Sequence, residues 1–271
     1  MSDFNKKLIF FEKQVKEKAP EIFKKIPTKN VVISEDEKIT YLQRAFKRII
    51  VTLSLMPSKT KAKVLDLGVS PYFLALLIKE IFKYDVTGIQ SPNVRWPGEE
   101  IKITKGEKIN GIPEYYCNVE KDKLPFKDKT FDIVICTEII EHLLQDPLFM
   151  LKEIRRVLKK DGTVILSTPN AINLYSRMRL LFGRNIYAGY SPYGPYGRHN
   201  REFTVDELRT LFKKAKLEIH QVILLNKSSA GMRREYEKSL VINFIYSLLT
   251  KLIPVFRENI FIVAHVKQCL K

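Results

Sequence analysis

The chain has 271 residues, 45% of them hydrophobic, and a formal net charge of +17. This length and apolar content suffice for one elaborated domain with a full core, which excludes a chain that needs disulfides to fold. The basic excess is spread along the whole chain. The positive charge can therefore reflect an ordinary solvated surface. It can equally reflect attraction to an anionic membrane, a nucleic acid or a phosphorylated acceptor.

Residues 1–60 are expected to form a helical extension, with helices over 4–26 and 36–55. From residue 61 to residue 271, strands and helices alternate, which predicts one α/β domain with a largely parallel, doubly wound sheet. The expected strands are 63–67, 85–90, 115–119, 131–136, 163–168, 217–225 and 258–266, and the expected helices are 71–83, 147–159, 205–215 and 235–252. Thr204 and Glu207 have the spacing of a capping box, and Asp161–Gly162 is expected to turn a helix into a strand.

The segment Val64–Tyr72 is the most informative part of the chain, because an apolar strand ends there in an acid, a glycine and a helix start. Gly68 supplies a sharp turn, Ser70 is placed to cap the next helix, and Pro71 suits its first position. The N–H groups of that helix attract an anion, whereas Asp66 repels a pyrophosphate and attracts a cation. We expect a nucleotide-like ligand that carries both charges.

Three segments at family spacing resemble class I S-adenosylmethionine-dependent methyltransferases: residues 64–68, 124–142 and 158–170. The resemblance covers about residues 60 to 266 and includes the ubiquinone-biosynthesis and polysaccharide-associated enzymes. It implies a Rossmann-like sheet of seven strands whose last strand is antiparallel. It also implies S-adenosylmethionine as the cofactor.

The same resemblance implies which residues contact the cofactor: Asp66, Gly68, Ser70, Gln90, Asn118, Val119 and Thr137. Gln90 stands where the family has an acid for the ribose hydroxyls, and an amide there weakens binding by about 1 kcal/mol. Asn118 stands where an acid commonly meets the adenine amino group. Ser70 and Tyr72 replace two loop glycines, and the Tyr72 ring is expected to narrow or cover the pocket. These departures keep a non-catalytic binding protein as an alternative.

The run Thr137–His142 is expected at the carboxyl edge of the sheet, where open α/β sheets bind ligands. His142 or His199 is the expected general base. Glu138, Glu141, His142 and His199 also resemble the metal ligands of small-RNA terminal 2′-O-methyltransferases, which would imply a divalent ion. A similar run occurs in members of the class without metal, and these polar groups could equally hold loops through hydrogen bonds.

Residues 171–203 hold seven aromatic residues and five arginines, with no lysine. Loops of this length are usually functional or disordered. Arginine suits fork-like recognition of phosphate or carboxylate, and tyrosine offers a flat surface to a sugar or a base. We interpret this insertion as a lid over the acceptor. The alternative is a surface loop whose aromatic residues pack on the domain.

The remaining features concern the compartment. Cys117, Cys136 and Cys269 show no paired spacing, which favours a reduced, cytoplasmic setting. The start of the chain lacks the apolar stretch of a secretory signal. The most apolar window, Leu240–Thr250, is shorter than the roughly 20 residues that span a bilayer, so we expect a buried helix or one that lies on a surface. Peripheral association with a membrane stays open.

These observations predict an O-directed methyltransferase that acts on a small, glycan or lipid-linked acceptor. An anionic group on this acceptor would suit the basic surface and the arginines of the insertion. An RNA 2′-O-methyltransferase with a metal site is the alternative from another substrate class. It would show salt-sensitive RNA binding and sensitivity to a chelator. The sequence does not identify the acceptor.

Overall fold

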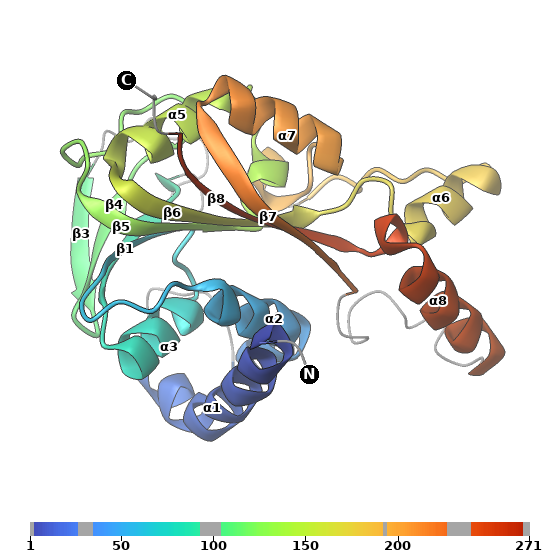
Figure 1. The fold of residues 1–271 in the computed structure, drawn as a ribbon, viewed down its shortest axis with the longest axis horizontal. Coiled ribbons are helices and arrows are strands. Elements are labelled where there is room, and N and C mark those ends of the chain that lie inside the picture. The colour runs from blue at the N-terminus through green and yellow to red at the C-terminus, as the bar shows by residue number, and fades with distance from the viewer. Residues whose placement is uncertain (1–2, 27–34, 93–103, 192–193, 227–239, 268–271) are drawn as a thin grey trace.

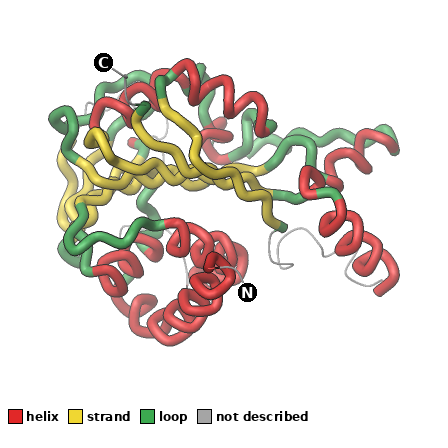
Figure 2. Tube along the Cα trace, in the orientation of Figure 1, coloured by secondary structure: helices red, strands yellow, loops and turns green. Residues whose placement is uncertain are grey.

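The computed structural model describes residues 3–26, 35–92, 104–191, 194–226 and 240–267, which form one mixed sheet with helices on both faces (Figures 1 and 2). The strand order is β3-β4-β2-β1-β5-β6-β8-β7. The strands are β1 (Lys63–Leu67), β2 (Asp85–Gln90), β3 (Thr104–Ile109), β4 (Ile112–Tyr116), β5 (Phe131–Thr137), β6 (Leu158–Pro169), β7 (Leu217–Leu225) and β8 (Asn259–Val266).

The helices form three groups around this sheet (Figure 1). One face carries α1 (Asp3–Lys25), α2 (Glu35–Leu55) and α3 (Phe73–Phe82), and the other carries α5 (Leu148–Val157) and α7 (Val205–Lys214). Beyond one end of the sheet lie α6 (Leu174–Leu181) and α8 (Leu240–Leu252). Short 3₁₀ turns are η1 (Ile140–His142), η2 (Pro195–Gly197) and η3 (Pro254–Phe256).

The alternation of side chains along the central strands builds two cores, one on each face of the sheet. Val64 and Ile133 pack with α1, α2 and α3. Their neighbours Leu65 and Val134 point to the opposite face and pack with α5 and α7. Because both faces are covered, these strands are apolar at nearly every position, as expected for a parallel sheet.

The seven expected strands are present, and the antiparallel last strand is confirmed. Strands β4, β2, β1, β5 and β6 are parallel, and β8 lies between β6 and β7, antiparallel to both. The sheet of the described residues has an eighth strand, β3, that we did not predict. It forms a hairpin with β4 through Asn110 and Gly111, whose φ values of 50° and 74° fit a tight hairpin turn. Since Asn-Gly is a strong hairpin signal, this dipeptide could have revealed it. The hairpin also moves the expected strand at 115–119 to 112–116.

The expected start of the helix after β1 is wrong. Helix α3 begins at Phe73, and its N-cap residue is Tyr72. Tyr72 has φ 67°, and its side chain makes no capping hydrogen bond. Ser70 therefore does not cap this helix, and Pro71 is not its first residue. In contrast, the capping box is confirmed, because Thr204 and Glu207 each bond the other's backbone N–H at the start of α7.

Two other boundaries differ from expectation. Helix α5 ends at Val157 and β6 begins at the next residue, so Asp161–Gly162 lies within a strand. The insertion 171–203 contains α6, which the sequence pattern did not reveal. Of the expected helix 235–252, residues 235–239 lie outside the described residues, and α8 accounts for the rest.

The cysteines of the described chain, Cys117 and Cys136, are buried and form no disulfide, while Cys269 lies outside the described residues. None of the helices in the described ranges has both the length and the apolar character needed to cross a membrane.

Candidate functional site

The turn after β1 places a glycine where no side chain fits. The backbone N–H groups of Gly68 and Val69 both donate to the carbonyl of Ile89, at 2.8 and 3.1 Å, which fixes the turn against β2. Gly68 has φ +75°, and a Cβ atom there would lie 2.3 Å from Cδ1 of Ile139. Its backbone conformation therefore favours glycine, and any added side chain would also displace the side chain of Ile139.

We predict that Gly68→Ala destabilises the protein by more than the roughly 1–3 kcal/mol that an unfavourable backbone conformation alone costs, because Ile139 must also move. Gly183→Ala is the matched control, since Gly183 has φ +67° but no atom within 4 Å of an added Cβ. Urea denaturation of both variants gives the comparison. Equal losses of unfolding free energy would show that the contact with Ile139 has no cost.

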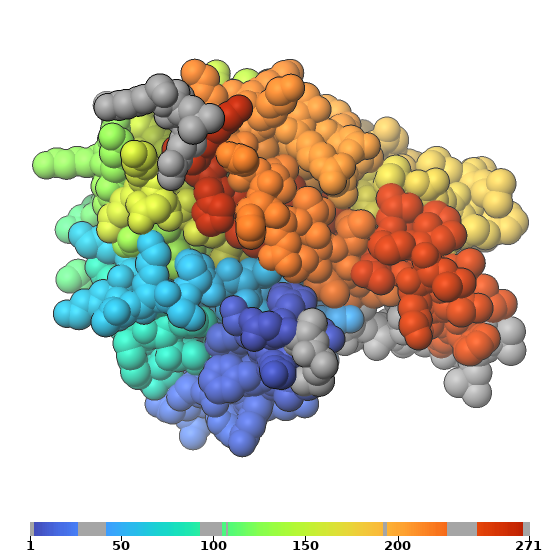
Figure 3. Space-filling view, in the orientation of Figure 1, coloured from blue at the N-terminus to red at the C-terminus, as the bar shows by residue number. Residues whose placement is uncertain are grey.

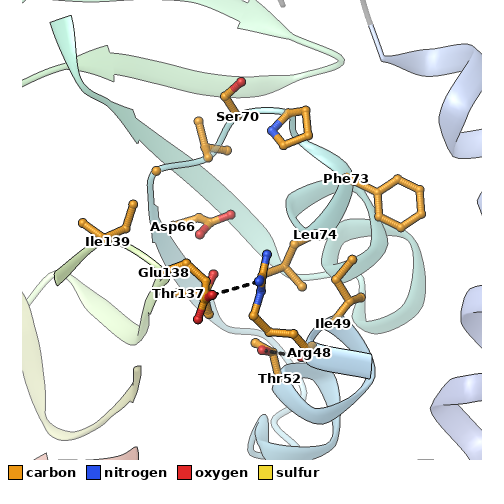
Figure 4. Close-up of a pocket in the computed structure, with 13 residues that line it drawn as sticks. Arg48, Ile49, Thr52, Asp66, Ser70, Phe73, Leu74, Thr137, Glu138 and Ile139 are labelled. Atoms are coloured by element: carbon orange, nitrogen blue, oxygen red, sulfur yellow. Dashed lines mark hydrogen bonds and ion pairs between the residues drawn. The ribbon is translucent and has the colours of Figure 1, made fainter. Parts of the chain in front are cut away.

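A cavity of about 160 Å³ lies between the end of β1 and helix α2 (Figure 4). Asp66 from β1, Thr137 from β5 and Arg48 from α2 line it. Asp66 is 3% exposed. Burial raises the pKa of this carboxyl to about 7, because it disfavours the charged form. A cationic ligand group would bring Asp66 back to its ionised form.

Arg48 forms an ion pair with Glu138 at 3.1 Å across this cavity (Figure 4). Glu138 has φ 55°, and its Oε1 accepts hydrogen bonds from Ser167 and Asn259, each at 3.1 Å. The cavity thus holds a fixed cation beside two acids. This arrangement suits a zwitterion, whose ammonium would face Asp66 and whose carboxylate would face Arg48.

A second cavity, of about 310 Å³, adjoins the first, and the two share Gly68, Ser70, Glu138 and Ile139. It lies at the ends of β1, β2 and β4. Its walls include four of the residues predicted to contact the adenosine part of the cofactor or to act on the acceptor: Gln90, Asn118, Val119 and His142. Apolar walls with a few polar groups are typical of small-molecule sites. Together with the first cavity, it contains all seven residues expected to contact the cofactor.

Tyr72 does not narrow either cavity. Its side chain is buried in the core between the sheet and helices α1, α2 and α3, and its hydroxyl donates to Oε1 of Glu114 at 2.6 Å. The expectation that this ring covers the pocket is wrong, because the left-handed backbone at Tyr72 turns the side chain inward. Asn118 is partly engaged, since its Oδ1 accepts from the backbone N–H of Glu120 at 3.0 Å.

His142, which lines the second cavity, lies beside His199, which lines neither cavity. The rings of His142 and His199 are 5.0 Å apart and nearly perpendicular. Nδ1 of His142 lies 2.8 Å from the carbonyl of Arg198, and Nδ1 of His199 lies 2.9 Å from a carboxylate oxygen of Glu202. Since both partners accept hydrogen bonds, each Nδ1 carries the proton and each Nε2 of a neutral ring has the lone pair. Burial, and then the neighbouring His199, lower the pKa of His142.

Three of the four expected metal ligands come together, because ligand atoms of Glu141, His142 and His199 lie within 4.8 Å of one another. Glu141 is fully buried and accepts from the hydroxyl of Thr168 at 3.0 Å. Glu138 is turned to Arg48 instead. The group offers an oxygen and two imidazole nitrogens, a ligand set that suits a divalent transition metal. The metal assignment stays a prediction.

The insertion 171–203 is fixed to the site at its C-terminal end. Tyr196 lines the second cavity. Asn200 bonds two consecutive carbonyls of η1, its Nδ2 donating to His142 and its backbone N–H to Glu141, both at 2.8 Å. Several arginines of the insertion are engaged elsewhere, as when Arg201 pairs with Glu207. Tyr193 lies outside the described residues, and the role of the segment as an acceptor lid stays a prediction.

Sequence reasoning missed Arg48 and Thr52, which α2 brings to the first cavity. No motif marks them, since their place depends on how α2 docks on the sheet. Thr52 Oγ1 donates to the carbonyl of Arg48 at 2.9 Å, within the same helix. Ile139 was also missed, although it follows a predicted contact, because only the fold places it over Gly68.

The comparisons with known proteins agree with this geometry. The methyltransferase domain family matches residues 39–222. A probable S-adenosylmethionine-dependent methyltransferase of Mycobacterium tuberculosis is 28% identical over 168 residues, which are 60% of this chain and 51% of that protein. The ubiquinone biosynthesis O-methyltransferase of Haemophilus ducreyi is 32% identical over 123 residues, 40% of this chain and 45% of the relative. The chain thus spans about half the length of these curated relatives.

A solved structure shows the same fold at low sequence identity. Phosphoethanolamine N-methyltransferase 2 of Haemonchus contortus, in complex with S-adenosyl-L-methionine, superimposes with a TM-score of 0.52 at 14% identity. The match covers 87% of this chain and 58% of that one. The family match spans well over half of the sequence and includes every described residue that lines the two cavities. The chain therefore belongs to the methyltransferase domain family, as its motifs predicted.

Proposed function

We propose that this protein transfers the methyl group of S-adenosylmethionine to an oxygen atom of a small, glycan or lipid-linked acceptor. One observation carries the proposal: two cavities join at Gly68, one with Asp66 and Arg48 and the other with apolar walls and Gln90. When bound, S-adenosylmethionine would supply a methyl group on a positively charged sulfur, which needs no further activation.

The residues present fit this ligand. In the first cavity Asp66 would hold the ammonium and Arg48 the carboxylate of the methionine part. In the second cavity the apolar walls would enclose adenine, and Gln90 would bond the ribose hydroxyls through its amide. Because Gly68 has no side chain, Ile139 can lie close to the backbone where the two cavities meet, beside Ser70 and Glu138.

His142 supports an oxygen acceptor. Its lowered pKa keeps the imidazole neutral at pH 7, and the bond from Nδ1 to the Arg198 carbonyl leaves Nε2 as the basic atom. This nitrogen would take the proton of an acceptor hydroxyl, a role that typically adds 10²- to 10⁴-fold to a rate. The similarity to a protein named as an O-methyltransferase of ubiquinone biosynthesis is in line with this acceptor class.

Replacing Arg48 by methionine is expected to weaken the binding of S-adenosylmethionine by roughly 10- to 100-fold. The reason is the loss of a charge-assisted hydrogen bond, worth about 1.5–3 kcal/mol. Calorimetric titration measures the effect. Arg44→Met is the control, because Arg44 is exposed on the same helix and lines neither cavity. An unchanged affinity in Arg48→Met, or an equal loss in both variants, would contradict the assignment.

The proposed reaction is tested directly with methyl-labelled S-adenosylmethionine. The purified protein is incubated with phenols, sugars and lipid-linked phenols, and with the corresponding amines as matched acceptors. We expect label to pass to a hydroxyl compound and not to its amine counterpart. Transfer to the amines alone would contradict the O-directed reaction while leaving methyl transfer itself in place.

A further inference from the structure

Helix α8 exposes apolar side chains on its outer face, whereas a helix that packs on a core buries them. Phe244, Ile245, Leu248 and Leu252 share one side of the helix and are 44–68% exposed. The inward side carries Thr250, which is buried and bonded to Asn226 at 2.8 Å. A helix that turns its polar side to the protein and its apolar side to solvent is built to meet an apolar partner.

A second set of exposed apolar side chains lies beside it, on α6 and the loop that follows. Leu181, Phe182, Tyr187 and Tyr190 are between 69% and 95% exposed. Figures 1 and 3 show α6 and α8 together at one end of the molecule. The guanidinium of Arg177 in α6 lies 5.3 Å from the ring centre of Phe256, just after α8, which ties the two elements together. We call the exposed apolar residues of α6, its loop and α8 the end surface.

The charges of the end surface have one sign. Residues 174–190 include three arginines and residues 240–257 include a lysine and an arginine, and neither stretch contains an acidic residue. The adjoining acid, Glu258, is half-buried and accepts a hydrogen bond from the hydroxyl of Tyr246 in α8. Arg184 and Lys251 are exposed among the apolar side chains. Apolar and aromatic groups mixed with basic ones are the composition of segments that lie in the interface of an anionic bilayer.

We propose that the end surface docks this protein on an anionic lipid bilayer. Its apolar side chains would enter the boundary between headgroups and acyl chains, and Arg184 and Lys251 would bind lipid phosphates. The loop after α6 continues to Tyr196 and Arg198, which contact the second cavity and His142. Docking would thus place the acceptor side of the site near the membrane, where a lipid-linked acceptor resides. This last step rests on the proposed function, whereas the docking itself does not.

Charge favours a bilayer over a second copy of the chain. In a two-fold dimer the same patch meets itself, so the arginines and Lys251 would face like charges without an acid from either stretch to pair with them. A bilayer that contains anionic lipids supplies the missing counter-charge.

The test is sedimentation of the full chain with vesicles of phosphatidylglycerol or of phosphatidylcholine. We expect binding to phosphatidylglycerol that exceeds binding to phosphatidylcholine by tenfold or more, as about 1 kcal/mol per basic residue implies. The variants Leu181→Ser/Phe244→Ser and Arg184→Glu/Lys251→Glu should each lose tenfold or more of this binding. All these residues are exposed, so the variants should retain their fold and their affinity for S-adenosylmethionine.

Matched controls are Ile9→Ser/Phe10→Ser and Lys61→Glu/Lys213→Glu, whose side chains are also exposed, on other parts of the protein. These should bind vesicles as the parent chain does. Equal losses of vesicle binding in the controls and the test variants would show that binding depends on exposed apolar and basic residues anywhere on the protein, and would overturn the proposal. So would an absence of vesicle binding, including the case in which light scattering shows a dimer that the end-surface variants dissociate. Vesicle binding without affinity for S-adenosylmethionine would sustain the docking surface and refute the proposed function.

Discussion

Asp66→Asn is expected to make the protein more stable at pH 8 and a poorer binder of S-adenosylmethionine. The carboxyl is buried at the end of β1, and its pKa rises from an ordinary 3.8 to about 7. Each pKa unit corresponds to 1.36 kcal/mol, so the ionised carboxylate costs the folded state on the order of 4 kcal/mol. The asparagine removes this cost, and it also removes the negative charge that would hold an ammonium.

The pH dependence of this effect has a definite sign. Below about pH 4 the carboxyl is protonated in both the folded and the unfolded chain, and the variant should gain little. Between pH 4 and 7 only the unfolded chain ionises Asp66 fully, so the stability of the parent protein falls as the pH rises. Above pH 7 the difference is constant. Thermal denaturation of the parent protein and the variant at pH 5 and pH 8 measures it.

Asp132→Asn is the control, because this carboxylate is also poorly exposed but has the opposite surroundings. Nζ of Lys159 lies 2.8 Å and Nζ of Lys59 3.3 Å from its oxygens, and these bonds hold its pKa below the ordinary value despite some burial. Removing this charge should destabilise the protein at pH 8. If Asp66→Asn were destabilised to a similar extent, the Asp66 carboxylate would already have a partner in the protein that stabilises its charge, which would contradict its assignment to a ligand ammonium.

His142→Gln is expected to lower the turnover rate by 10²- to 10⁴-fold, the range of a lost general base, with little change in the binding of S-adenosylmethionine. The pH profile gives a second readout. Because burial lowers the pKa of His142, the rate of the parent enzyme should fall only below about pH 6.5, as the imidazole becomes protonated. The variant should lose this acid limb.

A chelator separates the general base from the metal site. If Nε2 of His142 takes the proton directly, a chelator should leave the rate unchanged, and His199→Gln should have a much smaller effect than His142→Gln. If Glu141, His142 and His199 hold a divalent ion, the chelator and both variants should reduce the rate to similar levels. A His142→Gln variant with full activity would contradict both roles.

The sequence predicted the central sheet well, because its strands are buried on both faces and carry a strong apolar signal. The placement of Asp66 and Gly68 at the carboxyl edge of the sheet was also predictable, since the ends of parallel strands meet at one edge. The inward turn of Tyr72 was not readable, because it depends on a left-handed backbone that the sequence does not mark. Arg48 could not be placed at the site either, since its position depends on the docking of α2.

Helices α6 and α8 illustrate the same limit. Short helices such as α6 have weak periodicity, so its eight residues resembled loop sequence. The apolar pattern of α8 predicted a helix correctly, but it could not distinguish a buried face from an exposed one. The hydrogen bond that Thr250 Oγ1 accepts from Asn226 and the burial of Thr250 show which side is turned to the protein.

Calorimetric titration with S-adenosylmethionine between pH 5 and 8 tests the central claim most directly. If Asp66 receives the ammonium, binding should release a proton, the affinity should rise about tenfold per pH unit up to pH 7, and Asp66→Asn should remove this slope. Buffers with different ionisation enthalpies reveal the released proton. The absence of binding at millimolar ligand, or binding with the same pH dependence in Asp66→Asn, would contradict the account.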